Sequence, residues 1–559
     1  MNDKECHYDD LAFDEACLIL NTNDEEYNAT LYSLSSDCDL CPFIKVARIE
    51  QGRNASITLN TATAVTWRVY NDSGIKEFKS ATDESGIICQ FQPNLGEYGI
   101  FELIIDDEGC EFDTIVEPSN CYITLAIIFG VVLSILFGFS IVRSSVNFAR
   151  KKKYQEGKAD DNADEEEPAT RRILSIDTFR GICIMSMIFV TNDGAGYAFL
   201  QHSIWNGLSI TDLIFPSFLW IMGFCIPISL SSQLAKGVPR LSICQSILRR
   251  SVLLFLVGVS INSLDTAADL ENIRIFGVLQ RLGVAYFVVG ILYTLMSRRE
   301  EKRYENRTLS KIGDFLSLLP QWIVILIIVV LHCGITFFLP VPGCLTGYLG
   351  PGGRHDHGKY FNCTGGAAGY IDRIILGENH ISRNPTIVQV YGSGPFDPEG
   401  ILGCLTSIFQ TFLGVQAGKI LKVHRGWKSR IVRWLLLALF CGSLSATLHY
   451  TDVIPVNKSL WSLSFVLSTT SIGLGVLIIC YLLIDVTAIW RGGPFRIPGM
   501  NALVMYIGHH ICHQMFPFRW TYGEMKNSHT WRTIVALWDT TMWTIIGYIL
   551  HRKKIYISL

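Results

Sequence analysis

The spacing of apolar residues along this chain changes abruptly near residue 120. Before that point, residues 56–70 and 98–105 alternate apolar and polar side chains, and this period of two predicts β-strands with one buried face. Asn71-Asp72-Ser73-Gly74 has the composition of a turn. Residues 1–120 are therefore expected to form a small, antiparallel β-rich domain.

After residue 120, the chain consists largely of continuous apolar runs. Each run is near the length of a membrane-spanning helix, about 20 residues, and we expect eleven such helices. Residues 143–170 separate the first helix from the other ten; they are basic and then acidic, and we expect a disordered cytosolic linker. The expected spans are residues 121–142, 174–192, 209–232, 244–263, 274–297, 319–339, 400–421, 431–449, 462–484, 498–516 and 531–550.

The composition supports an α-helical polytopic membrane protein in a lipid bilayer. Hydrophobic residues make up 49% of the 559 residues and charged residues only 17%, and the mean hydropathy is +0.30, which excludes an ordinary soluble enzyme. The net charge of −3 is uninformative because the placement of charge matters more. No basic patch suits nucleic acid, since Lys151–Lys153 directly follows an apolar span and is explained as a membrane anchor.

Cysteines and glycosylation sequons gather in the part of the chain before the second span. Seven of the 17 cysteines lie in residues 1–121, so we expect disulfides and an oxidising compartment. Cys38-x-x-Cys41 also has the spacing of half a zinc site, but no second pair has suitable spacing. A signal peptide is expected for such a domain, yet no apolar segment suited to one lies before residue 120. The sequons expected to carry glycans are at Asn28, Asn54, Asn71, Asn362 and Asn457.

Lys and Arg are concentrated in alternate loops, which predicts that those loops are cytosolic. With eleven spans, a luminal N-terminal domain places the C-terminus in the cytosol. The longest loop of the bundle, residues 340–399, then lies in the lumen, and its length and Gly and Pro content favour a cover for a functional site. The chain ends in Tyr556-Ile557-Ser558-Leu559, which matches lysosomal sorting tails but is also short enough to occur by chance.

Residues 174–230 hold ionisable side chains in or beside apolar spans. Asp177, Arg180 and Asp212 lie at the span edges, and His202 lies in the polar segment between two spans. Charged groups in hydrocarbon are costly and usually mark a functional site, and histidine exchanges protons near neutral pH. From the residues alone, His202 is either a catalytic group or a structural histidine bonded to loop carbonyls.

Several long motifs distinguish the chain after residue 171. They are Asp177-Thr-Phe-Arg-Gly181, His202-x-x-Trp-Asn-Gly-Leu208, Asp212-Leu-Ile-Phe-Pro216, Val278-Leu-Gln-Arg-Leu-Gly283, LPVPGCLTGYLGPGG (339–353), NCTGGAAGYIDR (362–373), DPEGILG (397–403), LGVQAGKIL (413–421), IPVNKSLWSLSF (454–465) and PGMNALVMYIGH (498–509). Together they resemble the heparan-α-glucosaminide N-acetyltransferase family of lysosomal membrane enzymes. The resemblance covers residues 171–559, a ten-helix acetyltransferase domain, whereas residues 1–120 match only in position and cysteine content.

The resemblance implies an acetyl transfer across the lysosomal membrane. The acetyl group of cytosolic acetyl-CoA passes to the terminal non-reducing glucosamine of heparan sulfate, which supports heparan sulfate degradation. Acetyl-CoA is then a co-substrate, and no permanently bound cofactor is expected. The expected partners are acetyl-CoA, heparan sulfate ends and the bilayer, with a homo-oligomer left open. The resemblance also implies that His202 is the catalytic histidine.

Amide formation from a thioester needs an uncharged amine, so a base must take the amine's proton and donors must stabilise the oxyanion. His202 is the candidate base. It either carries the acetyl group as a covalent relay or acts in a direct transfer, which we favour. Asn192 is a candidate to polarise the thioester carbonyl, although an ungapped alignment places the family's asparagine opposite Thr191. Asp193 is a candidate for holding His202 or the amine.

Arginines near the predicted cytosolic face are candidates for the phosphates of CoA, because a guanidinium group binds phosphate through two parallel hydrogen bonds. Arg180 is the strongest, since it lies inside an apolar run. Arg281 lies deeper and either pairs with Asp177 or Asp212 or contacts the pantetheine arm. The alternative for the others is membrane anchoring. The candidates are Arg172, Arg180, Arg249, Arg250 and Arg281.

Acidic residues on the predicted luminal side are candidates for gripping the amino sugar. Asp372, Asp397 and Glu399 are the residues concerned, and His509 is a candidate for lining the same pocket. Asp397-Pro398-Glu399 before an apolar span is also typical of an ordinary helix N-cap.

Two histidine clusters were weighed as metal sites. Zinc needs three or four converging ligands. His355-Asp356-His357 is a short loop segment, and His509, His510 and His513 have helical spacing near a luminal end, where His509 is expected to line the pocket and the other two to cap the helix. No metal site is therefore expected.

Three other classes of protein are alternatives to a heparan-α-glucosaminide N-acetyltransferase. A solute transporter would move its ligand unchanged, so acetylation of glucosamine by the purified protein separates it from an enzyme. An acyltransferase with another acceptor would be identified by screening amino sugars. An adhesion or receptor protein would depend on residues 1–120, so activity without that domain argues against it.

Overall fold

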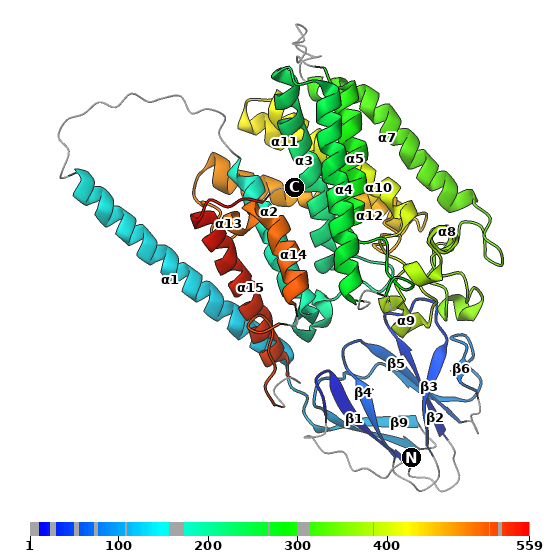
Figure 1. Ribbon diagram of the computed structural model, residues 1–559. Helices are drawn as coiled ribbons and strands as arrows, with labels where there is room; N and C mark the ends of the chain where they lie inside the picture. The colour runs from blue at the N-terminus through cyan, green and yellow to red at the C-terminus, as the bar shows by residue number, and fades with distance from the viewer. Residues whose placement is uncertain are drawn as a thin grey trace.

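The computed structural model describes residues 11–22, 29–49, 55–71, 76–106, 109–155, 173–265, 269–298, 312–383, 385–513, 515–523 and 528–557. A β-rich domain lies at one end of a helical bundle, below it in Figure 1. The predicted fold class, a polytopic helical protein with a small β-rich domain at its N-terminus, is confirmed.

Two sheets form the β-rich domain. Their strand orders are β4-β1-β8-β9 and β6-β3-β2-β5-β7. Among the described strands all pairs are antiparallel except β1 with β8, so the expected antiparallel pattern fails at that one pair. Leu18, Trp67 and Phe101 are buried in its core. The strands are β1 Glu15–Thr22, β2 Ala29–Ser35, β3 Phe43–Ile49, β4 Ala55–Asn60, β5 Val65–Asn71, β6 Phe78–Lys79, β7 Ile87–Phe91, β8 Ile100–Asp106 and β9 Gly109–Val116.

Nine helices in the described part of the chain are long and apolar enough to cross a membrane. The expected span 498–516 is divided at Asn501 into α13 and α14, and α14 is shorter than a full span. The nine are α2 Leu174–Thr191, α3 Ile214–Ala235, α4 Arg240–Asp265, α5 Val278–Met296, α7 Gly313–Phe338, α10 Ile401–Val423, α11 Trp427–Tyr450, α12 Leu463–Tyr481 and α15 His529–Arg552. Helix α1 Cys121–Gln155 precedes them, and α13 Arg496–Met500 and α14 Ala502–Cys512 lie between α12 and α15.

Helix α1 extends beyond its expected end at residue 142. It continues to Gln155, so the first part of the expected linker 143–170 is helical, and residues 156–170 lie outside the described residues. The described apolar stretch of α1, Cys121–Ile135, is shorter than a candidate span.

Helix α10 occupies the centre of the bundle. In its most apolar stretch of 18 residues, 89% of the residues are buried. The helix packs closely against α3. A Cβ atom on Gly414 of α10 would lie 2.1 Å from the backbone oxygen of Trp220, and one on Gly223 of α3 would lie 1.9 Å from that of Thr411. Both glycines are therefore required for two helices to approach this closely.

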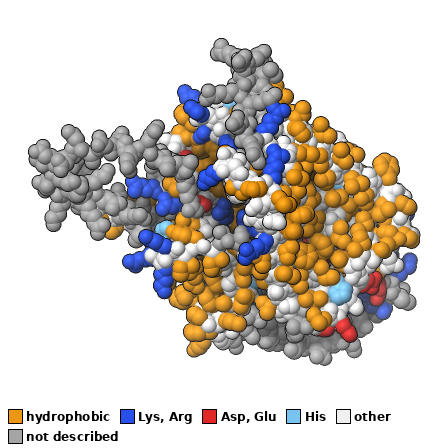
Figure 2. Space-filling view, turned by 45° about the horizontal axis from the view of Figure 1, so that its top comes forward, with side chains coloured by type: hydrophobic (Ala, Val, Ile, Leu, Met, Phe, Trp, Pro, Cys, Tyr) orange, Lys and Arg blue, Asp and Glu red, His pale blue; other side chains and the backbone are white. Residues whose placement is uncertain are grey.

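The two ends of the bundle differ in charge. Figure 2 shows broad apolar sides and a gathering of Lys and Arg at the end away from the β-rich domain. Helices α2, α4 and α14 start at this basic end, whereas α3, α5 and α10 start at the end beside the β-rich domain (Figure 1). The basic residues there are Lys236, Arg240, Arg298, Lys422, Arg425, Lys428, Arg430, Arg433, Arg491, Arg496, Arg552, Lys553 and Lys554.

The segment 340–399 lies between the bundle and the β-rich domain. It contains α8 Gly366–Leu376 and α9 Thr386–Tyr391, and a disulfide joins Cys344 to Cys363. The hydroxyl of Tyr391 donates to the carbonyl of Asp37 over 3.2 Å. Cys38–Cys41 and Cys89–Cys110 are disulfides, so the first pair is no half of a zinc site.

The sequons differ in exposure. Asn71 and Asn362 are exposed, whereas Asn457 is 0% exposed. Its amide nitrogen donates to Asn206 Oδ1 over 3.2 Å, and its side-chain oxygen accepts from the backbone nitrogen of Leu460 over 2.8 Å. The amide of Asn457 is thus enclosed in the folded chain, unlike those of Asn71 and Asn362, and the glycans remain predictions. Asn28 and Asn54 lie outside the described residues.

Candidate active site

The connection between α2 and α3 carries His202 at the end of the bundle beside the β-rich domain. His202 Nδ1 lies 2.7 Å from Oδ1 of Asp212, which sits in a short turn, η4 Thr211–Leu213, just before α3. Oδ2 of Asp212 accepts hydrogen bonds from the backbone nitrogens and hydroxyls of Ser203 and Ser209. The Asp212 side chain is 0% exposed and that of His202 is 45% exposed, so a fixed carboxylate holds an accessible imidazole.

Lys458 completes this group from the connection between α11 and α12. Its Nζ lies 2.8 Å from His202 Nδ1 and 3.4 Å from Asp212 Oδ1. Burial lowers the pKa of Lys458, and the carboxylate of Asp212 opposes that effect. Nδ1 of His202 serves only one of these two partners at a time: it either donates its proton to Asp212 or accepts one from the ammonium of Lys458. In the first tautomer Lys458 pairs with Asp212, and Nε2 is left free to accept a proton.

A cavity of about 670 Å³ leads from His202 into the bundle. Helix α3 lines it from Ile214 to Leu230, a distance of about 24 Å at the rise of an α-helix. That distance is most of the apolar thickness of a bilayer, about 30 Å. His202, Lys458 and Glu399 line the cavity too, and Arg180 and Arg250 line it on α2 and α4.

The two lining arginines lie on helices that begin at the basic end. Arg180 Nη1 is 3.7 Å from Asp177 Oδ1, and the guanidinium of Arg250 lies 4.7 Å from the ring centroid of Tyr286. Arg249 is exposed on the outside of α4, and Arg172 lies outside the described residues. Of the expected phosphate-binding residues, the structure therefore brings Arg180 and Arg250 to the cavity.

Arg281 has a different role from either one expected. It is 1% exposed, and its Nη2 donates to the carbonyls of Pro398 and Gly400 over 3.1 Å each. Its guanidinium lies 4.6 Å from the ring centroid of Trp461. Arg281 therefore holds the start of α10, because carbonyls rather than Asp177 or Asp212 face it.

Asn192 is also turned away from the cavity. It is 6% exposed, and its amide donates to Asp539 Oδ2 over 2.8 Å and to the carbonyl of Ile188 over 3.2 Å. Among the described residues the cavity lining includes Thr191 and not Asn192, so the expected contact of Asn192 with a thioester is absent from this geometry. The side chain of Asp193 lies outside the described part of the structure.

The acidic residues expected to grip an amino sugar are mostly engaged in the fold. Asp397 accepts two hydrogen bonds from Arg274 at 2.9 and 2.6 Å, and Arg274 also pairs with Glu399. Burial would raise the pKa of Glu399, but the guanidinium of Arg274 outweighs it and lowers that pKa. Glu399 lines the cavity, whereas Asp397 is 1% exposed.

Asp372 holds the start of α10. It is 1% exposed, and its Oδ1 accepts a hydrogen bond from the backbone nitrogen of Ile401 over 2.9 Å. The N-cap role that the sequence suggested for Asp397 is thus filled at Ile401 by Asp372. Burial raises the pKa of the Asp372 carboxyl to about 7. His509 is likewise enclosed, with Nδ1 3.6 Å from Asp539 Oδ2, and His510 is the histidine of that helix that lines the cavity.

Two residues of the site were missed by reasoning from sequence. Lys458 lies inside the motif 454–465, but a lysine in a loop has no distinguishing pattern. Arg274 precedes α5 without a motif of its own. Both meet their carboxylate partners only through the fold.

These features define a class of protein: an integral membrane protein with a histidine–aspartate–lysine group at one end of a cavity that runs deep into its helices. The family model described as heparan-alpha-glucosaminide N-acetyltransferase, catalytic, matches residues 172–299. That range contains His202, Asp212, Arg180 and Arg250.

Two curated relatives match almost the whole chain. The heparan-alpha-glucosaminide N-acetyltransferase of Homo sapiens is 35% identical over 99% of this chain and 89% of the relative. The one of Mus musculus is 34% identical over 98% of this chain and 89% of the relative. The chain therefore belongs to the heparan-alpha-glucosaminide N-acetyltransferase family and is an acetyltransferase, as the motifs predicted.

Proposed function

We propose that this chain moves the acetyl group of acetyl-CoA across a membrane to the amino group of a terminal glucosamine of heparan sulfate. The observation that carries the proposal is the single cavity lined by Arg180 and Arg250 on one side and by His202 on the other. A thioester held by the arginines then reaches the imidazole within one enclosed space. The acceptor is inferred from the activity after which the human and mouse relatives are named.

In the proposed reaction His202 is the general base. Nε2 accepts a proton from the amine, the amine nitrogen bonds to the acetyl carbon, and the bond from that carbon to sulfur breaks. The proton then passes from His202 to the thiolate of CoA. Asp212 keeps Nδ1 protonated and stabilises the imidazolium that forms, and Lys458 faces the negative charge that develops on the acetyl oxygen.

We favour direct transfer over an acetylated histidine. One cavity that meets both the arginines and His202 supports simultaneous binding of the two substrates, so no covalent relay is required. An acetyl group on His202, trapped from acetyl-CoA without acceptor, would contradict this preference.

The CoA portion is proposed to bind at Arg180 and Arg250. Both lie on helices that begin at the basic end of the bundle, and guanidinium groups suit phosphate oxygens. Arg172 is proposed as a further contact outside the cavity mouth, whereas Arg249 faces the outside of α4 and is not part of the proposed site. No resident cofactor is part of this proposal; acetyl-CoA is a co-substrate.

We propose that the β-rich domain faces the lysosomal lumen and the basic end faces the cytosol. The disulfides at the β-rich end support an oxidising side, as do the exposed sequons Asn71 and Asn362. The positive charge at the opposite end supports a cytosolic side. Tyr556 and Ile557 near the C-terminus are exposed, as a sorting signal requires.

The acceptor is proposed to approach from the β-rich side. A second cavity, of about 610 Å³, is lined by Asp37, Asp39 and Gln92 of the β-rich domain and by Ser203, the neighbour of His202. Carboxylates at this entrance suit a protonated amino sugar.

The deciding experiment uses the purified chain in sealed vesicles, with radiolabelled acetyl-CoA outside and glucosamine-terminated heparan fragments inside. Wild type is expected to label the acceptor, and His202→Ala is expected to lose the transfer while still binding acetyl-CoA. Transfer of unchanged ligand without acetylation would instead identify a transporter. Full activity of His202→Ala would refute the proposed base.

A further inference from the structure

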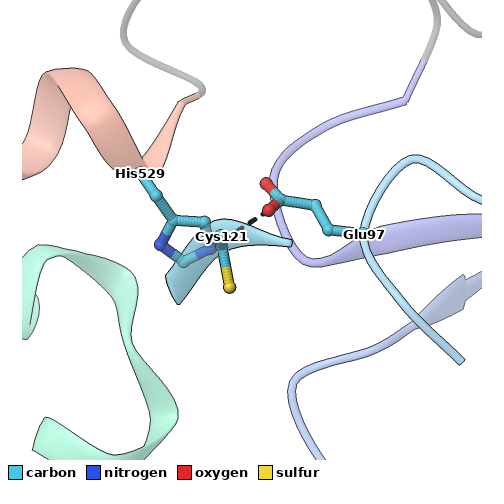
Figure 3. Close-up of side chains that lie close together, drawn as sticks. All are labelled: Glu97, Cys121 and His529. Carbon is cyan, nitrogen blue, oxygen red and sulfur yellow. Dashed lines mark ion pairs between the residues drawn. The ribbon is translucent and has the colours of Figure 1, made fainter. Parts of the chain in front are cut away.

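Three potential metal ligands, Glu97, Cys121 and His529, meet where the β-rich domain touches the bundle, away from the cavity, and Asp14 lies beside His529. Asp14 and Glu97 come from the β-rich domain, Cys121 is the first residue of α1, and His529 is the first residue of α15. Ligand atoms of Glu97, Cys121 and His529 all lie within 4.8 Å of one another. Figure 3 shows these three side chains converging from separate segments.

The hydrogen bonds of His529 orient its ring toward the carboxylates. Nδ1 lies 3.1 Å from the carbonyl oxygen of Ala195, and a carbonyl only accepts, so Nδ1 carries a proton. Nε2 then faces Asp14 Oδ1 at 3.1 Å and Glu97 Oε2 at 3.6 Å. A cation is therefore needed between this nitrogen and the two carboxylates: either a second proton on the ring, which makes His529 an imidazolium paired with Asp14 and Glu97, or a metal ion.

The ring of His529 is held firmly in this orientation. It lies edge-on to Phe13, with centroids 5.7 Å apart, and against Tyr197 at 4.7 Å. The guanidinium of Arg532, in the same helix, lies 3.7 Å from the ring centroid of Phe13. A metal-binding histidine usually donates its other N–H to a carbonyl or carboxylate, and the bond to Ala195 is of this kind.

Two further ligands are available for a cation. Glu97 is 6% exposed, and its Oε1 is buried with no hydrogen-bond partner among the described residues. Cys121 is a free thiol, whereas the other described cysteines of the β-rich domain, Cys17 among them, are disulfide-bonded. A buried carboxylate oxygen without a partner is costly, and coordination would satisfy it.

We propose that Asp14, Glu97, Cys121 and His529 bind one divalent transition-metal ion of the zinc type. One thiolate, one imidazole and two carboxylates are ligand types that zinc accepts in four-coordinate sites. Ligand atoms about 2.0–2.3 Å from a tetrahedral zinc ion are about 3.3–3.7 Å apart, so the cluster has to contract only modestly. Hard ions such as Ca²⁺ would avoid the thiolate.

Such an ion would join four segments that are distant in sequence. It would tie the β-rich domain to α1 and α15 and, through the hydrogen bond from His529 to Ala195, to the turn that follows Asn192. The site would therefore stabilise the domain junction without touching the acetyl group. Loss of the ion is expected to lower the thermal stability of the chain and to change its affinity for acetyl-CoA less.

Metal content of the full chain tests the proposal directly. The protein is purified in detergent without a histidine tag, incubated with Zn²⁺ at neutral pH, dialysed and analysed by elemental mass spectrometry. One zinc ion per chain is expected for wild type and for the matched control Cys512→Ser, a free cysteine of α14, and loss of that ion for Cys121→Ser. With Co²⁺ in place of Zn²⁺, a thiolate-to-cobalt absorption band is expected in wild type and not in Cys121→Ser.

A measurement on the unchanged protein covers the case in which variants misfold. Zn²⁺ is expected to protect Cys121 from alkylation, read at the level of the peptide, while labelling of Cys512 stays unchanged. The proposal is overturned if wild type and Cys121→Ser bind the same amount of zinc per chain. It is also overturned if the extent of Cys121 alkylation is the same with and without Zn²⁺. Metal-free protein whose thermal stability rises as pH falls, with the rise lost in His529→Gln, would show that a proton on His529 is the cation and would also overturn it.

Discussion

Nδ1 of His202 lies 2.7 Å from Oδ1 of Asp212, and the second oxygen of that carboxylate accepts hydrogen bonds from Ser203 and Ser209. The carboxylate is buried and fully engaged, whereas the imidazole is exposed to the cavity. In the proposed reaction Asp212 acts through His202, because the tautomer in which Nδ1 donates to Asp212 leaves Nε2 free as the base.

Asp212→Asn is expected to lower kcat by up to about 10⁴-fold, the loss seen when the aspartate partner of a catalytic histidine becomes an amide. The amide NH₂ favours the tautomer in which Nε2 is protonated and is no longer a base. Acetyl-CoA binding is expected to stay unchanged in a calorimetric titration. Ser209→Ala, which removes one of several donors to Asp212, is the control with a small effect, and unchanged kcat in Asp212→Asn would contradict the role of this pair.

Lys458→Met is expected to reduce kcat by about 10²-fold, the scale of losing one oxyanion-stabilising donor. Lys458→Arg keeps the positive charge and is expected to recover part of the rate. Initial rates at saturating acetyl-CoA measure both variants. Equal losses in the two variants would indicate that the lysine serves packing rather than charge.

Arg250→Ala is expected to weaken acetyl-CoA binding by about 10- to 100-fold, which corresponds to one charge-assisted hydrogen bond of about 1.5–3 kcal/mol. Arg249→Ala is the matched control, because its neighbouring side chain is exposed on the outer face of α4. Binding is measured on detergent-solubilised protein. Similar losses in both variants would mean that general positive charge, and not the cavity wall, attracts the CoA phosphates.

The raised pKa of the Asp372 carboxyl leads to a prediction of how the stability of the folded chain depends on pH. Burial raises the pKa of this carboxyl to about 7, against about 3.9 when unfolded. The folded chain therefore holds a proton that the unfolded chain releases, so stability falls as pH rises from about 4 to about 7, by at most about 4 kcal/mol.

The thermal unfolding midpoint of wild type is expected to fall across this pH range because of Asp372. Asp372→Asn keeps an acceptor for the backbone nitrogen of Ile401 and is expected to flatten the profile. A slope that is the same in wild type and Asp372→Asn would assign the pH dependence to other groups. The direction suits a protein whose Asp372 side faces an acidic compartment.

Much of the architecture was readable from local pattern. Apolar runs of spanning length located the helices, because a segment in hydrocarbon must satisfy its own backbone, and alternation located the strands. The pattern was less reliable where a helix is interrupted, as at Asn501, or continues into charged residues, as α1 does. Neither feature changes the apolar count enough to be seen in the sequence.

The candidate site was readable in part. His202 and Arg180 stood out because polar side chains in apolar surroundings are costly, and the structure places both on the cavity. Arg281 carried the same signal and proved to hold the start of α10 instead. The cost of burial marks an ionisable residue, but whether its partner is a substrate or a carbonyl is decided by what packs beside it.

The sequence by itself determined the membrane class of this protein, its β-rich first domain, its family and the importance of one histidine, because these depend on local composition and on motifs. Only the tertiary structure decided that Asp212 and Lys458 meet His202, that Arg250 rather than Arg249 faces the cavity, and that Asn457 is enclosed. Those relationships join segments as far apart as His202 and Lys458. Packing around α10 sets them, and no spacing along the chain encodes the direction in which a side chain finally points.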